Sequence, residues 1–333
     1  MRPTPPIIAH VNEIASVAST LAGEQRRRGM SVTVMDPAKP GARLPSPWKL
    51  AVAPLRVPAL AATTARIAIE RTDLVHVHYA TQAIVGRLAR RPYVVHCHGT
   101  DVRGLDPRSA LGRWVGAMLR PAALVLYSTP DLGSDVARFR SDAVFLPNPI
   151  DVERFSPSGS PDRDVLLGVK LDAVKGADIA IEAVYQLLVR RPGTTVTVIG
   201  SGPLTGLARQ RLGDRALFVE SIPHDQMAGL LRRHRVTLGQ FRLGILSQFE
   251  LEAMATGLAL VTEVRYPNPQ ALAAPVLRAT SPEQVAERLE GLLADESACQ
   301  SLALAGRRWV VDHHGVAAVV DQLDRLYRPI LDR

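Results

Sequence analysis

The chain has 333 residues, a length that suits two domains of ordinary size. Its content of 47% hydrophobic and 22% charged residues is typical of folded globular proteins and argues against disorder. The two cysteines, Cys97 and Cys299, are too few for a disulfide framework, which predicts a reducing, cytoplasmic location. No apolar run reaches the roughly 18 residues of a membrane span, and we expect no secretory signal at the start.

The net charge of +8 is unevenly distributed. Residues 1–150 contain 19 Lys and Arg against 10 Asp and Glu, whereas residues 151–333 contain 21 against 22. An anionic partner would therefore be attracted to the first half. Aromatic residues make up only 5%, and no zinc finger or recognition helix is present, so we expect no nucleic-acid partner.

Short apolar runs alternate with longer helical patterns along the first half. A helix is expected at 16–28, stopped by Gly29. Continuous apolar strands separated by helices indicate a parallel sheet covered on both faces, which is a doubly wound α/β domain. The expected strands are 7–11, 31–35, 73–78, 92–98, 122–127 and 143–147.

A stretch with four prolines, residues 145–164, has little periodicity and is predicted to be a linker. The alternation then restarts and predicts a second doubly wound domain, followed by a helical tail at 282–331. We therefore expect domains at 1–150 and 151–314, facing each other across a cleft. A proline-rich stretch at 37–58 is expected to be an ordered loop. The strands of the second domain are expected at 164–170, 194–200, 216–220, 235–241 and 258–262.

Two of the four lysines occur five residues apart in one loop, at Lys170 and Lys175. This loop, GVKLDAVKG at 168–176, leads from a strand into a helix. Backbone N–H groups at a helix start favour phosphate, and two ammonium groups would neutralise a diphosphate. In a chain with 36 arginines, such a lysine pair favours a phosphate site over a solvated surface loop.

A glycine-rich turn, VIGSGPLTG at 198–206, contains Gly200 and Gly202 and is followed by Glu220. It resembles a dinucleotide fingerprint, but it follows the second strand of its domain and not the first. A tight strand-to-helix turn explains it without a nicotinamide cofactor. Further along, Glu252 sits inside the apolar helical stretch of GILSQFELEAMATG, where it could bind sugar hydroxyls or form an ion pair with an arginine.

Histidines are concentrated near the ends of two strands of the first domain. By the period-two rule, His76 and His78 share one face of a strand, and so do His96 and His98. A metal site here would lack a fixed ligand spacing and a carboxylate to orient the ligands, so we expect no metal. His98, the last residue before a glycine, is expected to project into the cleft.

Five of these motifs, in this order, resemble the family-4 retaining glycosyltransferases of GT-B fold. HGTD at 98–101 is similar to the histidine motif of the family's cleft, and FLPNPIDVERFSP at 145–157 to its linker. GVKLDAVKGADIAIEA is similar to its G-R-L-x-x-x-x-K-G-x-D element, with Lys170 at the usual Arg. VIGSGP and ELEAMATGLALVT resemble its remaining two signatures. The resemblance covers most of the chain.

The resemblance implies a role for each matched position. His98 would be the catalytic candidate, and the last helix, within 315–333, would return to the N-terminal domain. The nucleotide diphospho-sugar, linked to UDP or GDP, would be a co-substrate, with no metal and no cofactor. The residues implied to bind the donor diphosphate are Lys170, Lys175, Gly244, Ile245 and Leu246. Those implied to bind the nucleotide are Gly200, Gly202, Ile222 and Glu252. Those implied on the acceptor side are Asn12, Glu13, Ser16 and Asp101.

Two departures from the family pattern bear on the substrates. The first Glu of the family's E-x7-E pair would fall at position 244, where this chain has Gly244. That Glu normally holds hydroxyls of the donor sugar, so its loss leaves the donor sugar open. The loop after the first strand is usually rich in glycine, whereas here it is NEIASVAS at 12–19, which implies a differently shaped acceptor pocket.

The expected function is transfer of a sugar to a small, anionic acceptor in natural-product biosynthesis. One alternative acceptor is an anionic lipid or cell-surface polysaccharide intermediate at a membrane, favoured by the basic first half and the loop that contains Trp48. A second alternative is a non-catalytic binder of nucleotide sugars, favoured only by Gly244. The sequence leaves the oligomeric state open.

Overall fold

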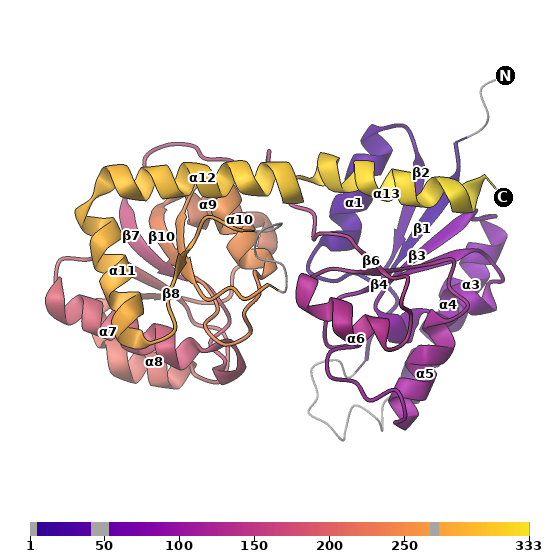
Figure 1. The fold of residues 1–333 in the computed structure, drawn as a ribbon, viewed down its shortest axis with the longest axis horizontal. Helices are drawn as coiled ribbons and strands as arrows, with labels where there is room; N and C mark the ends of the chain where they lie inside the picture. The colour runs from indigo at the N-terminus through magenta and orange to yellow at the C-terminus, as the bar shows by residue number, and fades with distance from the viewer. Residues whose placement is uncertain (1–4, 41–52, 267–272, 333) are drawn as a thin grey trace. The chain divides into compact units, whose positions relative to one another are not determined.

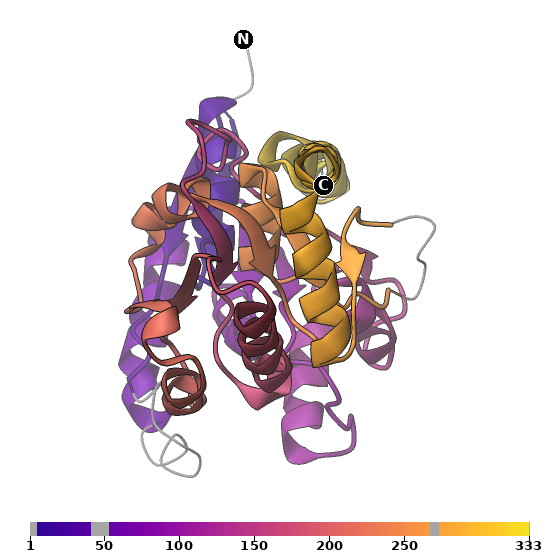
Figure 2. The same cartoon turned by 90° about the vertical axis from the view of Figure 1, so that its left-hand side faces the viewer.

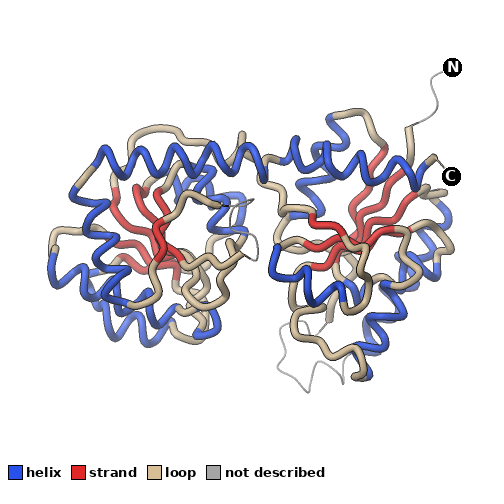
Figure 3. Tube along the Cα trace, viewed as in Figure 1, coloured by secondary structure: helices blue, strands red, loops and turns tan. Residues whose placement is uncertain are grey.

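The computed structural model describes residues 5–40, 53–266 and 273–332. It divides into two compact units, one formed by Met1–Pro149 with Val316–Arg333 and the other by Ile150–Gly315. Each unit contains a six-stranded parallel sheet with helices on both faces (Figures 1 and 3). The prediction of two doubly wound domains is confirmed. Most of the predicted loop at 37–58, including Trp48, lies outside the described residues.

The N-terminal unit has the strand order β2-β1-β3-β4-β5-β6. The chain order reverses beside β1, so the switch point of this sheet lies between β1 and β3. Ligands of doubly wound sheets bind beyond the carboxyl ends of the strands at such a point. The strands are β1 (Ile7–Val11), β2 (Ser31–Met35), β3 (Leu74–His78), β4 (Tyr93–Cys97), β5 (Leu124–Tyr127) and β6 (Val144–Phe145).

Helices cover both faces of this sheet. On one face α1 and α13 bury an apolar core that includes Ile8, Leu74 and Val94, and on the other face α3, α4 and α5 cover a second core. A Ser109 cap starts α5, because its hydroxyl accepts a hydrogen bond from the N–H of Gly112 at 3.0 Å. The helices of the unit are α1 (Val17–Arg27), α3 (Val57–Ile69), α4 (Ile84–Leu88), α5 (Ala110–Leu119), α6 (Gly133–Ala137) and α13 (Val316–Leu331).

The C-terminal unit has the strand order β12-β11-β10-β7-β8-β9. Its first strand, β7, is in the middle, and the direction of winding reverses between β7 and β10. This is the strand order of a dinucleotide-binding sheet, with the switch point between those two strands. The strands are β7 (Arg163–Leu167), β8 (Val196–Ile199), β9 (Leu217–Val219), β10 (His234–Leu238), β11 (Ala259–Thr262) and β12 (Leu277–Arg278).

The helices of the C-terminal unit pack on both faces of its sheet. Figure 2 views this unit from the side on which α7 and α11 lie, and these two helices share one apolar core with the strands. The second face is covered by α9, α10 and α12. The helices are α7 (Ala177–Arg190), α8 (Thr205–Leu212), α9 (His224–Arg232), α10 (Gln248–Thr256), α11 (Pro282–Ala294) and α12 (Glu296–His314).

The last helix returns to the N-terminal unit, as the family resemblance predicts. In α13, Asp321 pairs with Arg28 at 2.6 Å, and Gln322 donates a hydrogen bond to the carbonyl of Phe145 at 2.8 Å. The side chain of Tyr327 is buried in the core beneath α1. Within the part of the chain that the structure describes, no helix is long and apolar enough to cross a membrane.

Candidate functional site

The switch point of the C-terminal sheet lies between two loops that touch. One loop, residues 168–176, follows β7, and the other, residues 239–247, follows β10. They are joined by a hydrogen bond from the N–H of Phe241 to the carbonyl of Lys175, at 2.8 Å. A glycine with φ of 76°, Gly176, turns the first loop into α7 and packs against the second. The loop with the two predicted phosphate-binding lysines therefore lies at the switch point.

The ammonium groups of Lys170 and Lys175 differ from those cations of this protein that are held in ion pairs. Among the described residues, neither forms an ion pair, whereas Lys39 pairs with Asp36 at 2.7 Å and Arg242 pairs with Asp178 at 2.5 Å. Lys170 is exposed. Burial lowers the pKa of Lys175, and the nearby carboxylate of Glu250 partly opposes this shift. Two unpaired cations beside the start of a 14-residue helix suit an anionic ligand.

The glycine-rich loop after β8 packs against the lysine loop. The N–H of Leu171 donates to the carbonyl of Ser201 at 2.7 Å, and the N–H of Leu204 donates to the carbonyl of Leu171 at 2.9 Å. A Cβ at Gly202, where φ is 134°, would lie only 2.4 Å from that carbonyl oxygen. The space at Gly202 is thus filled by protein backbone, while a Cβ at Gly200 would meet only ordinary contacts.

The other predicted donor-side residues lie in loops at the same edge of the sheet. Ile222 is half-buried after β9, and Ile245 and Leu246 are buried before α10. The N–H of Leu246 donates to the hydroxyl of Tyr266 at 3.2 Å. At Gly244, φ is 69° and a Cβ would lie 2.9 Å from Nε of Arg265, so a glutamate there would be strained.

Glu252 is buried in α10, and its carboxylate accepts a hydrogen bond from Nε2 of His224 at 2.8 Å. This hydrogen bond raises the pKa of His224. The sequence left open whether Glu252 pairs with an arginine or binds sugar hydroxyls. In the structure its partner is a histidine that is 37% exposed.

A second carboxylate in α10, Glu250, was missed by sequence reasoning. It is fully buried and accepts five hydrogen bonds, which bring together the ends of β10, β11 and the loop before α10. The spacing of Ser247 and Glu250 is that of a capping box, and this signal could have identified it. Its donors are Gln240 N and Nε2, Ser247 N and Oγ, and Thr262 Oγ1.

In the N-terminal unit, Asp101 organises the loops after β3 and β4. Its carboxylate accepts hydrogen bonds from the N–H of Ala80 at 2.8 Å, of Gly99 at 2.9 Å and of His98 at 3.1 Å. It is 3% exposed, so it holds the backbone around His98. Burial raises the pKa of Asp101, and these hydrogen bonds oppose that shift.

The predicted acceptor-side loop adopts left-handed backbone without glycine. The φ angles of Asn12, Ala15 and Ser16 are 76°, 47° and 62°. Asn12 is buried and donates to the carbonyl of His78, while the carboxylate of Glu13 accepts from the N–H of Ser19 at 3.0 Å and caps α1. Strain of this kind tends to occur at functional sites. The loop lies at the switch point of the N-terminal sheet.

We expect Ala15→Gly to leave stability unchanged or to raise it by up to about 1.5 kcal/mol. A left-handed alanine costs roughly 1–2 kcal/mol, of which the entropy of glycine cancels roughly 0.5–1 kcal/mol. Ala61→Gly in α3, where alanine is exposed and helical, should instead destabilise by about 1 kcal/mol. Urea unfolding of both variants measures the difference. Equal destabilisation would show that Ala15 is unstrained.

Five histidines lie together on one face of the N-terminal sheet, four of them predicted and one, His10, not. Neighbouring rings are stacked or tilted with centroids 4.3–5.5 Å apart. Burial lowers the pKa of His10 to about 4 and that of His98 to about 3, and it lowers the pKa of the other three well below the ordinary value. Two triplets have ring nitrogens close enough to share a metal ion: His10, His76 and His78, and His78, His96 and His98.

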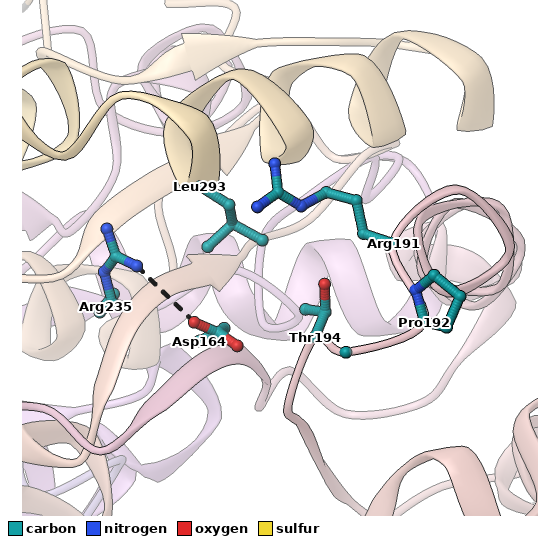
Figure 4. Close-up of a pocket in the computed structure, with 7 residues that line it drawn as sticks. Asp164, Arg191, Pro192, Thr194, Arg235 and Leu293 are labelled. Carbon is teal, nitrogen blue, oxygen red and sulfur yellow. Dashed lines mark ion pairs between the residues drawn. The ribbon is translucent and has the colours of Figure 1, made fainter.

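The C-terminal unit has a hollow of about 390 Å³, which Figure 4 shows in close-up. None of the residues that line it belongs to the loops at 168–176 and 239–247. Asp164 and Arg235, which are 3.7 Å apart, line it together with Arg191 at the end of α7. Asp164 and Arg235 belong to the first residues of β7 and β10, so this hollow opens at the amino ends of the strands. It is therefore separate from the predicted donor site.

Two family models match the chain. Residues 14–154 match the model described as glycosyltransferase family 4, and residues 180–325 match the model described as glycosyl transferase-like. A GDP-mannose-dependent alpha-(1-6)-phosphatidylinositol monomannoside mannosyltransferase of Mycolicibacterium smegmatis is 27% identical over 50% of this chain and 51% of its own length, so the match spans about half of that relative. A phosphatidyl-myo-inositol mannosyltransferase of Mycobacterium tuberculosis is 27% identical over 76% of this chain and 72% of its own length.

Solved structures share the fold of the whole chain. Sucrose-phosphate synthase of Thermosynechococcus elongatus superposes with a TM-score of 0.76 at 18% identity, over 98% of this chain and 100% of that one. HepE of Anabaena in complex with UDP-glucose gives a TM-score of 0.73 at 15% identity, over 97% and 99%. The two models together span both units, and the fold agrees with them. The chain is a family-4 glycosyltransferase with the GT-B fold.

Proposed function

We propose that this glycosyltransferase moves a hexose from a nucleoside diphospho-sugar to a lipid acceptor at an anionic membrane surface. The observation that carries the proposal is the outward face of α5. There the side chains of Leu111 and Trp114 are 52% and 42% exposed, beside the exposed Arg113 and Arg120. Both curated relatives are named for a phosphatidylinositol acceptor, which supports a lipid over a small natural product.

The charge and side-chain chemistry of this face suit a membrane interface. Residues 1–149 and 316–333 together have a net charge of +9, because 316–333 contain three basic and three acidic residues. Each basic residue near an anionic leaflet contributes about 1 kcal/mol of attraction. Tryptophan and leucine on the same helix face can enter the boundary between headgroups and acyl chains. The protein would then be a peripheral membrane enzyme.

The donor would bind at the switch point of the C-terminal sheet. Lys170 and Lys175 would face the diphosphate, where negative charge grows as the bond between sugar and phosphate breaks. Fixed cations at that position stabilise the transition state more than the ground state. Family resemblance supports retention of the anomeric configuration without a metal, since the two lysines supply the positive charge. It also supports binding of the nucleotide ribose by Glu252. The carboxylate of Glu252 would then give up its hydrogen bond from His224 and accept one from a ribose hydroxyl.

We expect the protein to bind vesicles of phosphatidylcholine and phosphatidylinositol, and the binding to weaken as salt rises. The double variant Leu111→Ala, Trp114→Ala should bind about tenfold or more weakly, because both apolar side chains then leave the interface. Leu304→Ala, which removes a leucine 60% exposed on α12 of the other unit, is the matched control and should bind normally. Vesicle sedimentation across a salt series measures all three proteins.

A transfer assay then tests the acceptor. Radiolabelled GDP-mannose and UDP-glucose are each offered with phosphatidylinositol vesicles and with soluble inositol phosphates. Transfer to the lipid that falls with the α5 double variant supports the proposal. Efficient transfer to a soluble acceptor, with no vesicle binding, would replace it with the small-acceptor function. Nucleotide binding without transfer to any acceptor would indicate a non-catalytic binder.

A further inference from the structure

Three of the five histidines form a continuous hydrogen-bonded row that starts at a glutamine. Oε1 of Gln25 in α1 lies 2.8 Å from Nε2 of His10, and Nδ1 of His10 lies 2.9 Å from Nε2 of His78. Nδ1 of His78 then lies 3.1 Å from Nε2 of His98. We call Gln25, His10, His78 and His98 the histidine row. It connects the buried side of α1 to the partly buried His98 at the carboxyl edge of the sheet.

The strand register explains why the row has this direction. His10 is paired with His76 on β3, so His78 lies two residues nearer the carboxyl edge. His78 is in turn paired with His96 on β4, and His98 again lies two residues further. Each hydrogen bond between two histidines thus crosses to the next strand and advances one side-chain position on the same face. The row ends where ligands of this fold class bind.

The glutamine gives the row a polarity. A carbonyl oxygen only accepts, so Nε2 of His10 must carry its hydrogen. A neutral imidazole has one donor and one acceptor, so Nδ1 of His10 accepts from His78, and Nδ1 of His78 accepts from His98. Nδ1 of His98 is then left as an acceptor. Burial lowers the pKa of all three imidazoles, which keeps them neutral as this pattern requires.

We propose that Gln25, His10 and His78 are positioning residues that hold His98 in one orientation and one tautomer, with Nδ1 ready to accept a hydrogen bond from a substrate hydroxyl. The inference rests on the proposed glycosyl transfer, for which the family resemblance makes His98 the catalytic candidate. The hydroxyl would belong to the donor sugar or to the acceptor. Burying a row of four polar side chains beside Ile8, Leu74 and Val94 is costly unless each hydrogen bond of the row is made.

A shared metal ion is the other use that these rings could have. The lone pair of an imidazole nitrogen lies in the plane of its ring. The rings of His76 and His78 are parallel to within 8° and stacked 4.3 Å apart, so they cannot direct their lone pairs at one ion. In the second triplet, Nδ1 of His78 and Nε2 of His98 are already joined by a hydrogen bond. The observed arrangement is that of a hydrogen-bonded row.

The first test needs no variant. Long-range proton–nitrogen NMR of the wild-type protein labelled with ¹⁵N-histidine distinguishes the two neutral tautomers. We expect His10, His78 and His98 each to carry the hydrogen on Nε2. A hydrogen on Nδ1 of any of the three, or stoichiometric binding of Zn²⁺ that shifts the nitrogens of His78 and His98, would overturn the proposal. This readout does not depend on which sugar or acceptor the enzyme uses.

The second test is kinetic and uses a matched pair of variants. Gln25→Leu removes the acceptor at the far end of the row without touching His98, whereas His76→Leu removes a stacked histidine outside the row. We expect His98 to populate both tautomers in Gln25→Leu. We expect kcat to fall by about tenfold, because a slight misplacement of the His98 imidazole has effects in this range. His76→Leu should keep the wild-type kcat and the Nε2–H tautomer of His98.

Nucleoside diphosphate affinity and thermal stability are measured for both variants. We expect affinity to be unchanged in both, because the row lies in the other unit from the lysines. If Gln25→Leu and His76→Leu lower kcat equally, the row has no role beyond packing, and the proposal is wrong. If the wild-type protein itself transfers no sugar but the tautomers are those expected for the row, the proposed function fails and the row stands.

Discussion

Lys175→Ala will weaken the binding of a nucleoside diphosphate by roughly 10- to 150-fold. A charge-assisted hydrogen bond contributes about 1.5–3 kcal/mol, and the neighbouring Arg242 is held by Asp178 and is not free to replace the lysine. Lys170→Ala should give an effect of the same kind, and smaller, because Lys170 is more exposed. Calorimetric titration with UDP and GDP measures both variants.

Lys39→Ala is the matched control, because Lys39 already pairs with Asp36 in the other unit. It should bind nucleotides like the wild type. Each titration is repeated with EDTA, which should change nothing if the lysines replace a divalent metal. Binding that disappears with EDTA yet survives Lys175→Ala would contradict both the lysine site and the absence of a metal.

Acidification will destabilise the N-terminal unit far more than the C-terminal unit. The five clustered histidines are neutral when folded, and their pKa values lie below the ordinary value. The unfolded chain therefore binds more protons in the window from about pH 6.5 down to the folded pKa, so stability falls as the pH falls through that window. His10, with a folded pKa of about 4, alone costs about 2 kcal/mol at about pH 5.

The C-terminal unit lacks such a cluster among its described residues. Burial lowers the pKa of His234, whereas the hydrogen bond to Glu252 raises that of His224, so the two effects oppose each other. Hydrogen exchange with mass spectrometry, from about pH 7 to about pH 5, reports each unit through its own peptides once intrinsic exchange rates are corrected. His76→Leu should make the pH dependence of the N-terminal unit shallower. Equal loss of protection in both units would contradict the prediction.

The fold could be predicted because local patterns and global topology agree. The strand at 31–35 is found at the residues expected, and the helix expected at 16–28 is observed at Val17–Arg27. Parallel strands buried on both faces are continuous apolar runs, so each strand can be recognised from its own residues alone. The switch points follow from strand order, and they bring the loop of Lys170 and Lys175 to the place where a ligand would bind.

Contacts between distant loops could not be predicted in the same way. The spacing of Gly200 and Gly202 suggested a close ligand, but the neighbour of Gly202 is the carbonyl of Leu171, some 30 residues earlier and on another loop. The row from Gln25 to His98 joins one helix and three strands, and only its period-two pairs are visible in the sequence. The spacing from Ser247 identifies Glu250 as part of a helix cap, but nothing in the sequence indicates its hydrogen bond with Thr262.

The return of α13 makes the N-terminal unit discontinuous, with the whole C-terminal unit inserted between its two segments. During synthesis, the segment up to residue 149 emerges first, but on one face of its sheet only α1 covers the apolar core until α13 is made. The inserted unit, which is contiguous in the chain, can complete its core earlier. We therefore expect the C-terminal unit to fold before the N-terminal unit is complete, which is the reverse of the usual order. Loss of the last 18 residues would leave Ile8, Leu74, Val94 and Leu126 open to solvent or to a chaperone on that side.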